Sequence, residues 1–224
     1  MAADEGPGLS EMPRRNRVDP WGDLHAVAGR GLFTGNRGCV VDNAEQVVRH
    51  HGSRVWIVCR TEFRGWRWPL ARARRWTPLF FLDEAVALAA GHRPCATCRR
   101  ADYLAYRDAV SRGQGATVPL RAAALNRRLA AETLPRGRGL SRAADRLIWT
   151  SPLNELPDGT VLAGADGSAE LVLGQHLLRF AFSGWEASRL RPHGVRVDVL
   201  TPPTSVLALA HGYTAILHAS ALRG

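Results

Sequence analysis

The sequence predicts an α+β protein, and three observations support this prediction. Short apolar runs of strand length, separated by turn residues, occupy residues 39–60. Helical patterns follow over residues 84–112 and resume after Pro119, and strand-like runs return from residue 160 onward. Strand-like and helical segments therefore occupy different parts of the chain, which is typical of α+β folds.

The length and composition describe a chain that can bury a sizeable core. It has 224 residues, of which 46% are hydrophobic, enough for one large domain or two small ones. It contains no run of about 20 apolar residues, so the sequence predicts no membrane segment. Four cysteines and no N-terminal apolar leader favour a cytoplasmic protein over a secreted disulfide scaffold.

The formal net charge is +10, and all thirty basic positions are arginine. An excess of cations favours a polyanionic partner, because binding to phosphates releases counterions. We therefore expect a nucleic-acid partner. The alternative is a basic surface that has no specific ligand.

The first hundred residues are expected to form an arm and a small sheet. Residues 1–17 lack periodicity and are predicted to be a flexible basic arm before a module at 18–112. Within the module, residues 39–41, 46–49 and 54–60 read as three strands of an antiparallel meander, because turn residues separate them.

Two helices are expected after this sheet. Asp83 suits the N-cap of a helix over 84–90, and Gly91 suits the left-handed residue that ends it. A second helix is predicted over 98–112.

The remaining chain is expected to form a connector and a second unit. Residues 113–158 are predicted to be a helical connector, with one helix beginning at Pro119 and another at 142–148. Residues 159–224 are predicted to be a β-rich C-terminal subdomain. Its expected strands are 160–162, 170–173, 177–182, 195–200 and 214–218, with a short helix after Pro202 and Pro203.

The strongest chemical signal is the pair Cys95 and Cys98, which have two residues between them. Such a pair can bind one side of a tetrahedral metal ion, and Cys39 and Cys59 supply enough further thiols for a four-cysteine Zn²⁺ site. The same pair also suits a redox dithiol or two buried thiols. All three interpretations are compatible with the spacing.

Two runs of sequence resemble the zinc-binding N-terminal domain of the Ada family of DNA-alkylation repair proteins. The family has an apolar strand that ends in cysteine and arginine, and this chain has Ile57-Val58-Cys59-Arg60. In the family, an aromatic strand, an alanine-rich helix and a Pro-Cys-x-x-Cys motif follow. The run from Phe80 to Cys98 of this chain has the same order. The resemblance covers about residues 36–110. The whole chain is also similar to a group of bacterial proteins that have no assigned function.

The resemblance implies that Cys59, Cys95 and Cys98 are zinc ligands. Where the family places its second cysteine, four residues after the first, this chain has Phe63. We expect Cys39 to supply the fourth ligand. The alternatives are a histidine or an open position at which the ion acts as a Lewis acid; the candidate histidines are His50, His51 and His92.

The resemblance also implies a contact with DNA, in repair or in regulation, and so favours DNA over RNA as the partner. In the family, the cysteine that matches Cys59 accepts a methyl group from a methylated DNA phosphate. A structural zinc site that presents arginines to phosphates is favoured here over this reaction. The predicted phosphate-binding residues are Arg60, Arg64, Arg93, Arg99 and Arg100. The tryptophans and arginines of residues 64–76 suit either base stacking or a closed sheet face.

An enzyme and an interaction module are the competing interpretations. Zinc nucleobase deaminases combine Pro-Cys-x-x-Cys with an upstream ligand and a glutamate that transfers protons. Glu62 is the candidate glutamate, but it follows Cys59 with two residues between them, whereas that motif has one. A zinc-stabilised protein-interaction module fits the same residues.

Overall fold

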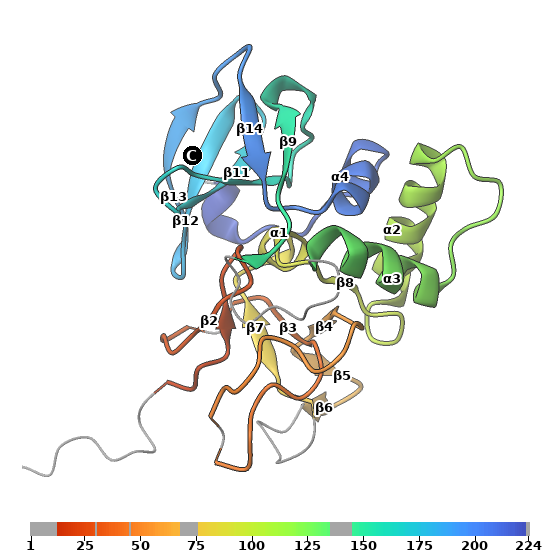
Figure 1. Ribbon diagram of the computed structural model, residues 1–224, viewed down its shortest axis with the longest axis vertical. Coiled ribbons are helices and arrows are strands. Elements are labelled where there is room, and N and C mark those ends of the chain that lie inside the picture. The colour runs from red at the N-terminus through yellow and green to blue at the C-terminus, as the bar shows by residue number, and fades with distance from the viewer. Residues whose placement is uncertain (1–12, 30, 45, 68–75, 135–144, 223–224) are drawn as a thin grey trace, which may run out of the picture.

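The computed structural model describes residues 13–29, 31–44, 46–67, 76–134 and 145–222. It combines two six-stranded sheets with four α-helices, which confirms the predicted α+β class. In Figure 1 one sheet lies at the bottom and the other at the top, with the helices between them and to one side. The predicted arm at residues 1–12 lies outside the described residues. Residues 13–17 belong to the fold, because Arg17 begins a strand.

The first sheet is formed by the N-terminal part of the chain and is mostly antiparallel. Its strand order is β2-β1-β7-β3-β4-β8. The pairs β1–β7 and β4–β8 are parallel. The strands are β1 (Arg17–Val18), β2 (Leu24–His25), β3 (Phe33–Asn36), β4 (Ile57–Arg60), β7 (Leu79–Phe81) and β8 (Arg93–Pro94). A two-stranded hairpin, β5 (Glu62–Phe63) and β6 (Trp66–Arg67), follows β4 directly.

The predicted meander at residues 39–60 is only partly correct. Its last strand exists as β4, but the first two make a single bridge between Val41 and Val47. On its antiparallel side β4 pairs with β3, a strand that was not predicted, and Thr34 lies opposite Cys59. Gly35 allows this approach, because a Cβ there would lie 2.2 Å from the carbonyl oxygen of Ile57.

The second sheet is antiparallel throughout, in the order β13-β12-β11-β10-β14-β9. Its strands are β9 (Trp149–Pro152), β10 (Val161–Ala163), β11 (Ala169–Leu173), β12 (His176–Ala181), β13 (Gly184–Leu190) and β14 (Arg196–Val199). Four of them match predicted strands. Strand β13 was missed, and β9 lies inside the segment that was predicted to be a helical connector.

The helices are α1 (Glu84–Ala89), α2 (Arg100–Gly113), α3 (Ala122–Thr133) and α4 (Pro203–Ala210), with short 3₁₀ turns at Leu153–Glu155 and Ala219–Leu222. Of the predicted helix at 142–148, residues 142–144 lie outside the described residues, and residues 145–148 form no α-helix. The predicted strand at 214–218 is wrong: the segment is extended, but it pairs with the first turn of α1 and not with a sheet. None of the described helices is long and apolar enough to cross a membrane.

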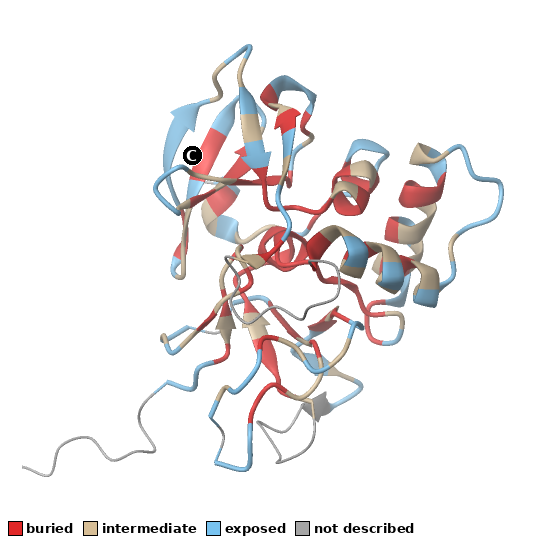
Figure 2. Cartoon of the chain, in the orientation of Figure 1, coloured by how far each residue is buried: buried red, intermediate tan, exposed pale blue. Residues whose placement is uncertain are grey.

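Helix α1 is completely buried and joins the two sheets (Figure 2). One core cluster contains Phe81 of the first sheet, Val86 of α1 and Leu171 of the second sheet. A second cluster packs α2 and α3 against α4. The core therefore crosses the predicted boundaries at 112 and 158.

The ends of α1 follow the local signals in the sequence. The Asp83 side chain accepts a hydrogen bond from the Val86 backbone N–H, at 3.0 Å, and caps the helix. The other carboxylate oxygen of Asp83 accepts hydrogen bonds from the Trp185 indole, at 2.6 Å, and from the His218 backbone, at 3.0 Å. Asp83 thus ties the helix start to the second sheet and to the C-terminal segment.

Gly91 ends α1 with a φ of 84°, as predicted. We expect Gly91→Ala to lower the free energy of unfolding by about 2–3 kcal/mol, because a side chain is strained at this φ and would crowd its neighbours. A Cβ there would lie 3.1 Å from Thr133 and from the Trp56 ring. Gly115→Ala is the matched control, since Gly115 has a φ of 62° and open space around it. Urea unfolding of both variants measures the difference in their free energies of unfolding. An equal loss of stability in Gly115→Ala would contradict the crowding at Gly91.

Candidate metal centre

Two adjacent strands deliver the cysteines that form the centre. Strand β4 carries Cys59, and the parallel strand β8 leads directly into Cys95. The Cys95 backbone N–H donates to the Val58 carbonyl at 2.9 Å, which continues the parallel ladder to the first cysteine. Hydrogen bonding between strands therefore fixes Cys59 beside Cys95, although they are far apart in sequence.

A tight turn brings Cys98 back to the same place. The Thr97 backbone N–H points at the Cys95 sulfur, at 3.4 Å, and the Arg99 N–H donates to the Cys95 carbonyl at 3.1 Å. Helix α2 begins at the following residue. The turn thus places both sulfurs on one side of the backbone.

The three sulfurs form a compact buried group. The Sγ atoms of Cys59, Cys95 and Cys98 all lie within 4.8 Å of one another, and all three residues are buried free thiols. A tetrahedral ion with Zn–S bonds of about 2.3 Å holds its sulfurs about 3.8 Å apart. The group therefore has nearly the dimensions that a metal ion requires.

The three thiols interact electrostatically. Hydrogen bonds from Cys59 and Cys98 lower the pKa of Cys95, whereas the hydrogen bonds with Cys95 and Cys98, together with burial, raise the pKa of Cys59. The lowered pKa of Cys95 favours its thiolate form. Thiolate is the form of cysteine that binds metals.

The group opens onto a pocket with a volume of about 470 Å³. The three cysteines form part of its wall, and Ile57 and Phe63 pack directly against the sulfurs. Among the described residues the rest of the lining is Thr34, Gly35, Asn36, Arg64, Trp76 and Thr97. This described lining contains no aspartate, glutamate or histidine.

The structure does not bring Cys39 to the metal centre. Cys39 lies in the loop after β3, where its thiol donates to the Val41 carbonyl at 3.3 Å. The backbone around it is fixed: Gly52 and Ser53 both donate to the Arg37 carbonyl. Our expectation that Cys39 completes a four-thiolate site does not agree with this placement.

The three candidate histidines also lie elsewhere. His50 is buried and its Nε2 is 3.0 Å from the Arg37 guanidinium, and burial lowers its pKa to about 2. His51 stacks against Trp56. His92 is buried between Phe81 and Trp56 and bonds the Ala90 carbonyl. None of the three joins the sulfur group.

Two of the five predicted phosphate-binding arginines are in the interior. Arg93 is 3% exposed and donates to Asn126 and to the Pro94 carbonyl. Arg99 is 1% exposed and pairs with Glu84 at 2.7 Å and with Asp102 at 2.9 Å. Their assignment to phosphate binding is wrong, because their guanidinium groups serve internal contacts.

The other three predicted arginines are exposed. Arg60 ends β4, Arg64 lies in the turn of the β5–β6 hairpin, and Arg100 begins α2. Arg64 lies against the Phe63 ring, at 5.2 Å from its centroid, and lines the pocket. The described arginines near the metal centre thus divide into a buried pair and an exposed set.

Glu62 does not take the position that a deaminase requires. It is exposed on β5 and is absent from the described lining of the pocket. Thr34 and Asn36 also line the pocket, which could not be predicted because their strand carries no motif. Phe63 stood out in the sequence only as a departure from the family pattern, yet its side chain contacts the sulfur group.

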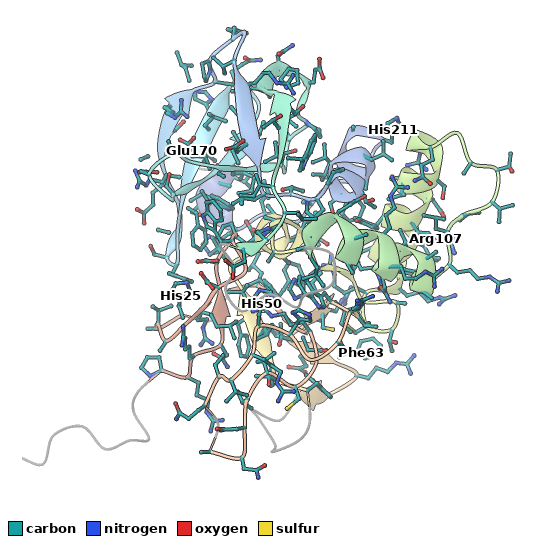
Figure 3. The ribbon with its side chains drawn as sticks, in the orientation of Figure 1. His25, His50, Phe63, Arg107, Glu170 and His211 are labelled. Carbon is teal, nitrogen blue, oxygen red and sulfur yellow. The ribbon has the colours of Figure 1, made fainter. Side chains whose placement is uncertain are left out.

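Figure 3 shows where the centre lies in the molecule. Phe63 is in the lower half with β4, β5 and β6, whereas Glu170 is on the upper sheet. Comparisons with family models, with curated proteins and with solved structures give no match to this chain. The resemblance to the Ada family therefore depends on the quoted residues alone and stays a prediction.

Proposed function

We propose that this protein binds one Zn²⁺ ion through the thiolates of Cys59, Cys95 and Cys98. The observation that carries the proposal is the convergence of three buried sulfurs within 4.8 Å. Soft thiolate ligands select zinc over magnesium, calcium or manganese, and a buried tetrahedral thiolate site is typical of zinc. The ion would hold β4, β8 and the start of α2 together.

Elemental analysis with native mass spectrometry tests this proposal. The purified protein is expected to carry about one zinc per chain, released by acid or by a strong chelator. A protein that is fully folded, has three reduced thiols and carries no metal after growth in zinc would contradict it.

We further propose that the exposed face around this centre binds nucleic acid. The support is the net charge of +10 and the exposed set Arg60, Arg64 and Arg100 near the zinc ligands. Phe63 and Trp76, in the pocket wall, offer aromatic faces for stacking with bases. The zinc would act structurally, by fixing the segments that carry these arginines.

Loss of two arginines tests the nucleic-acid proposal. In Arg60→Ala/Arg100→Ala, affinity for unrelated DNA sequences is expected to fall, and the slope of log K against log salt to flatten by about 2, because two phosphate contacts are lost. Fluorescence anisotropy over a salt series measures both. The matched control is Arg179→Ala/Arg196→Ala, which removes the same charge from exposed positions of the second sheet.

Two results would contradict this interface. An equal loss of DNA affinity in both double variants would mean that binding depends only on the total charge of the protein. No binding by the wild-type protein at low salt would favour the zinc-stabilised interaction module instead. Deamination is not proposed, because the described lining of the pocket offers no carboxylate beside the sulfurs.

A further inference from the structure

The pocket beside the sulfur group gives access to the metal position that the protein leaves free. Zinc is four-coordinate in most protein sites, and three cysteines fill three positions. The three cysteines themselves line the pocket, so the sulfur group borders this cavity directly. Its volume of about 470 Å³ is within the range of small-molecule sites.

In the part of the chain that the structure describes, the sulfur group has no fourth donor. Among the described residues no other cysteine, histidine, aspartate or glutamate joins the group. Cys39, the remaining thiol, is held elsewhere by its backbone contacts. An external donor can therefore complete four-coordination.

The lining indicates the chemistry of this donor. Ile57, Phe63 and Trp76 form apolar walls, which suit a short carbon chain. Arg64 is exposed, and among the described residues no ion pair with a carboxylate involves it. Its guanidinium can therefore pair with an anionic group on the ligand. A zinc ion in a thiolate environment favours a soft sulfur donor.

We propose that the pocket binds a small organic thiol that carries an anionic group, with its sulfur in the fourth position on the metal. This inference rests on the proposed zinc site. On binding, the thiol gives its proton to the solvent and its sulfur coordinates as a thiolate, with no oxidation or reduction. Arg64 pairs with the anionic end at the edge of the pocket.

Cobalt substitution makes the fourth position visible, because the absorption bands of Co²⁺ depend on its ligands. The Co²⁺-loaded protein is titrated with 3-mercaptopropionate, and 3-hydroxypropionate serves as the probe without sulfur. We expect the thiolate-to-cobalt charge-transfer band to rise from the intensity of three thiolates to that of four. The hydroxy compound is expected to leave this band unchanged.

Two variants locate the ligand. Arg64→Ala is expected to lower the affinity for 3-mercaptopropionate about three- to tenfold and to leave the affinity for the neutral 2-mercaptoethanol unchanged. Arg64→Lys is expected to keep the preference for the anionic thiol. Phe63→Cys places a thiol where the Phe63 side chain packs on the sulfur group. The Co²⁺-loaded Phe63→Cys variant is expected to show the band intensity of four thiolates before any thiol is added. Addition of 3-mercaptopropionate is then expected to leave this band unchanged.

Several results would overturn this inference while leaving the zinc site intact. These are a four-thiolate spectrum in the wild-type protein without added thiol, no response to millimolar 3-mercaptopropionate, or an undiminished response in Phe63→Cys. A response to oligonucleotide but not to thiol would also overturn it. Failure of the protein to bind Co²⁺ or Zn²⁺ at all would instead refute the proposed function.

Discussion

Cys59→Ser, Cys95→Ser and Cys98→Ser are each expected to abolish zinc retention and to lower the free energy of unfolding by about 4 kcal/mol or more. Serine is a poor zinc ligand, and the binding free energy of a structural metal is available only to the folded state. The loss is expected to be similar at all three positions, because each contributes one of three ligands. Zinc content and urea unfolding of the purified variants measure it.

Cys39→Ser is the matched control for these variants. Its thiol contacts only the Val41 carbonyl among the hydrogen bonds seen, and a serine hydroxyl can make the same bond. We expect unchanged zinc content and a change in unfolding free energy below about 1 kcal/mol. Loss of zinc from this variant, or full zinc content in any of the other three, would contradict the ligand set. Removal of zinc from the wild-type protein with a chelator should lower its stability to that of the three ligand variants.

Arg99→Met is expected to lower the free energy of unfolding by about 3–5 kcal/mol with zinc bound, because it leaves the Glu84 carboxylate buried without its cation. Glu84 is completely buried, and Arg99 contacts it at 2.7 Å. The same carboxylate accepts hydrogen bonds from the Tyr213 hydroxyl, at 2.6 Å, and from the Ile216 backbone, at 3.0 Å. The pair thus connects α1 and α2 to the C-terminal segment.

The double variant Glu84→Gln/Arg99→Met separates the pairing from the packing. It is expected to be more stable than Arg99→Met alone, since no unpaired charge remains in the interior. Arg107→Met is the exposed control: its pair with Asp108 is half-exposed, and its loss should cost at most about 1 kcal/mol. Strictly additive losses in the double variant would mean that the two side chains do not stabilise each other.

The parts of the fold that were predicted correctly depend on local signals. Asp83 and Gly91 mark the ends of α1 because capping and left-handed backbone are decided within a few residues. Cys95 and Cys98 meet for the same reason, since one turn joins them. The cysteine count made Cys59 and Cys39 equal candidates, and only the resemblance favoured Cys59, because its approach depends on the parallel pairing of β4 with β8.

The errors arose where distant residues decide the outcome. Arg93 and Arg99 were predicted to bind phosphates, because their internal partners Asn126 and Glu84 cannot be found from spacing. Residues 214–218 have a strand-like pattern, yet their N–H groups bind the carboxylates of Asp83 and Glu84. Counting cysteines favoured Cys39, but a count says nothing about the loop that holds its thiol away from the others.

Diffraction from crystals at the zinc absorption edge tests the central claim most directly. The account predicts one anomalous peak, about 2.3 Å from the sulfurs of Cys59, Cys95 and Cys98. A peak coordinated by Cys39 or His50, or a well-ordered sulfur group without a peak in protein that contains zinc, would contradict it.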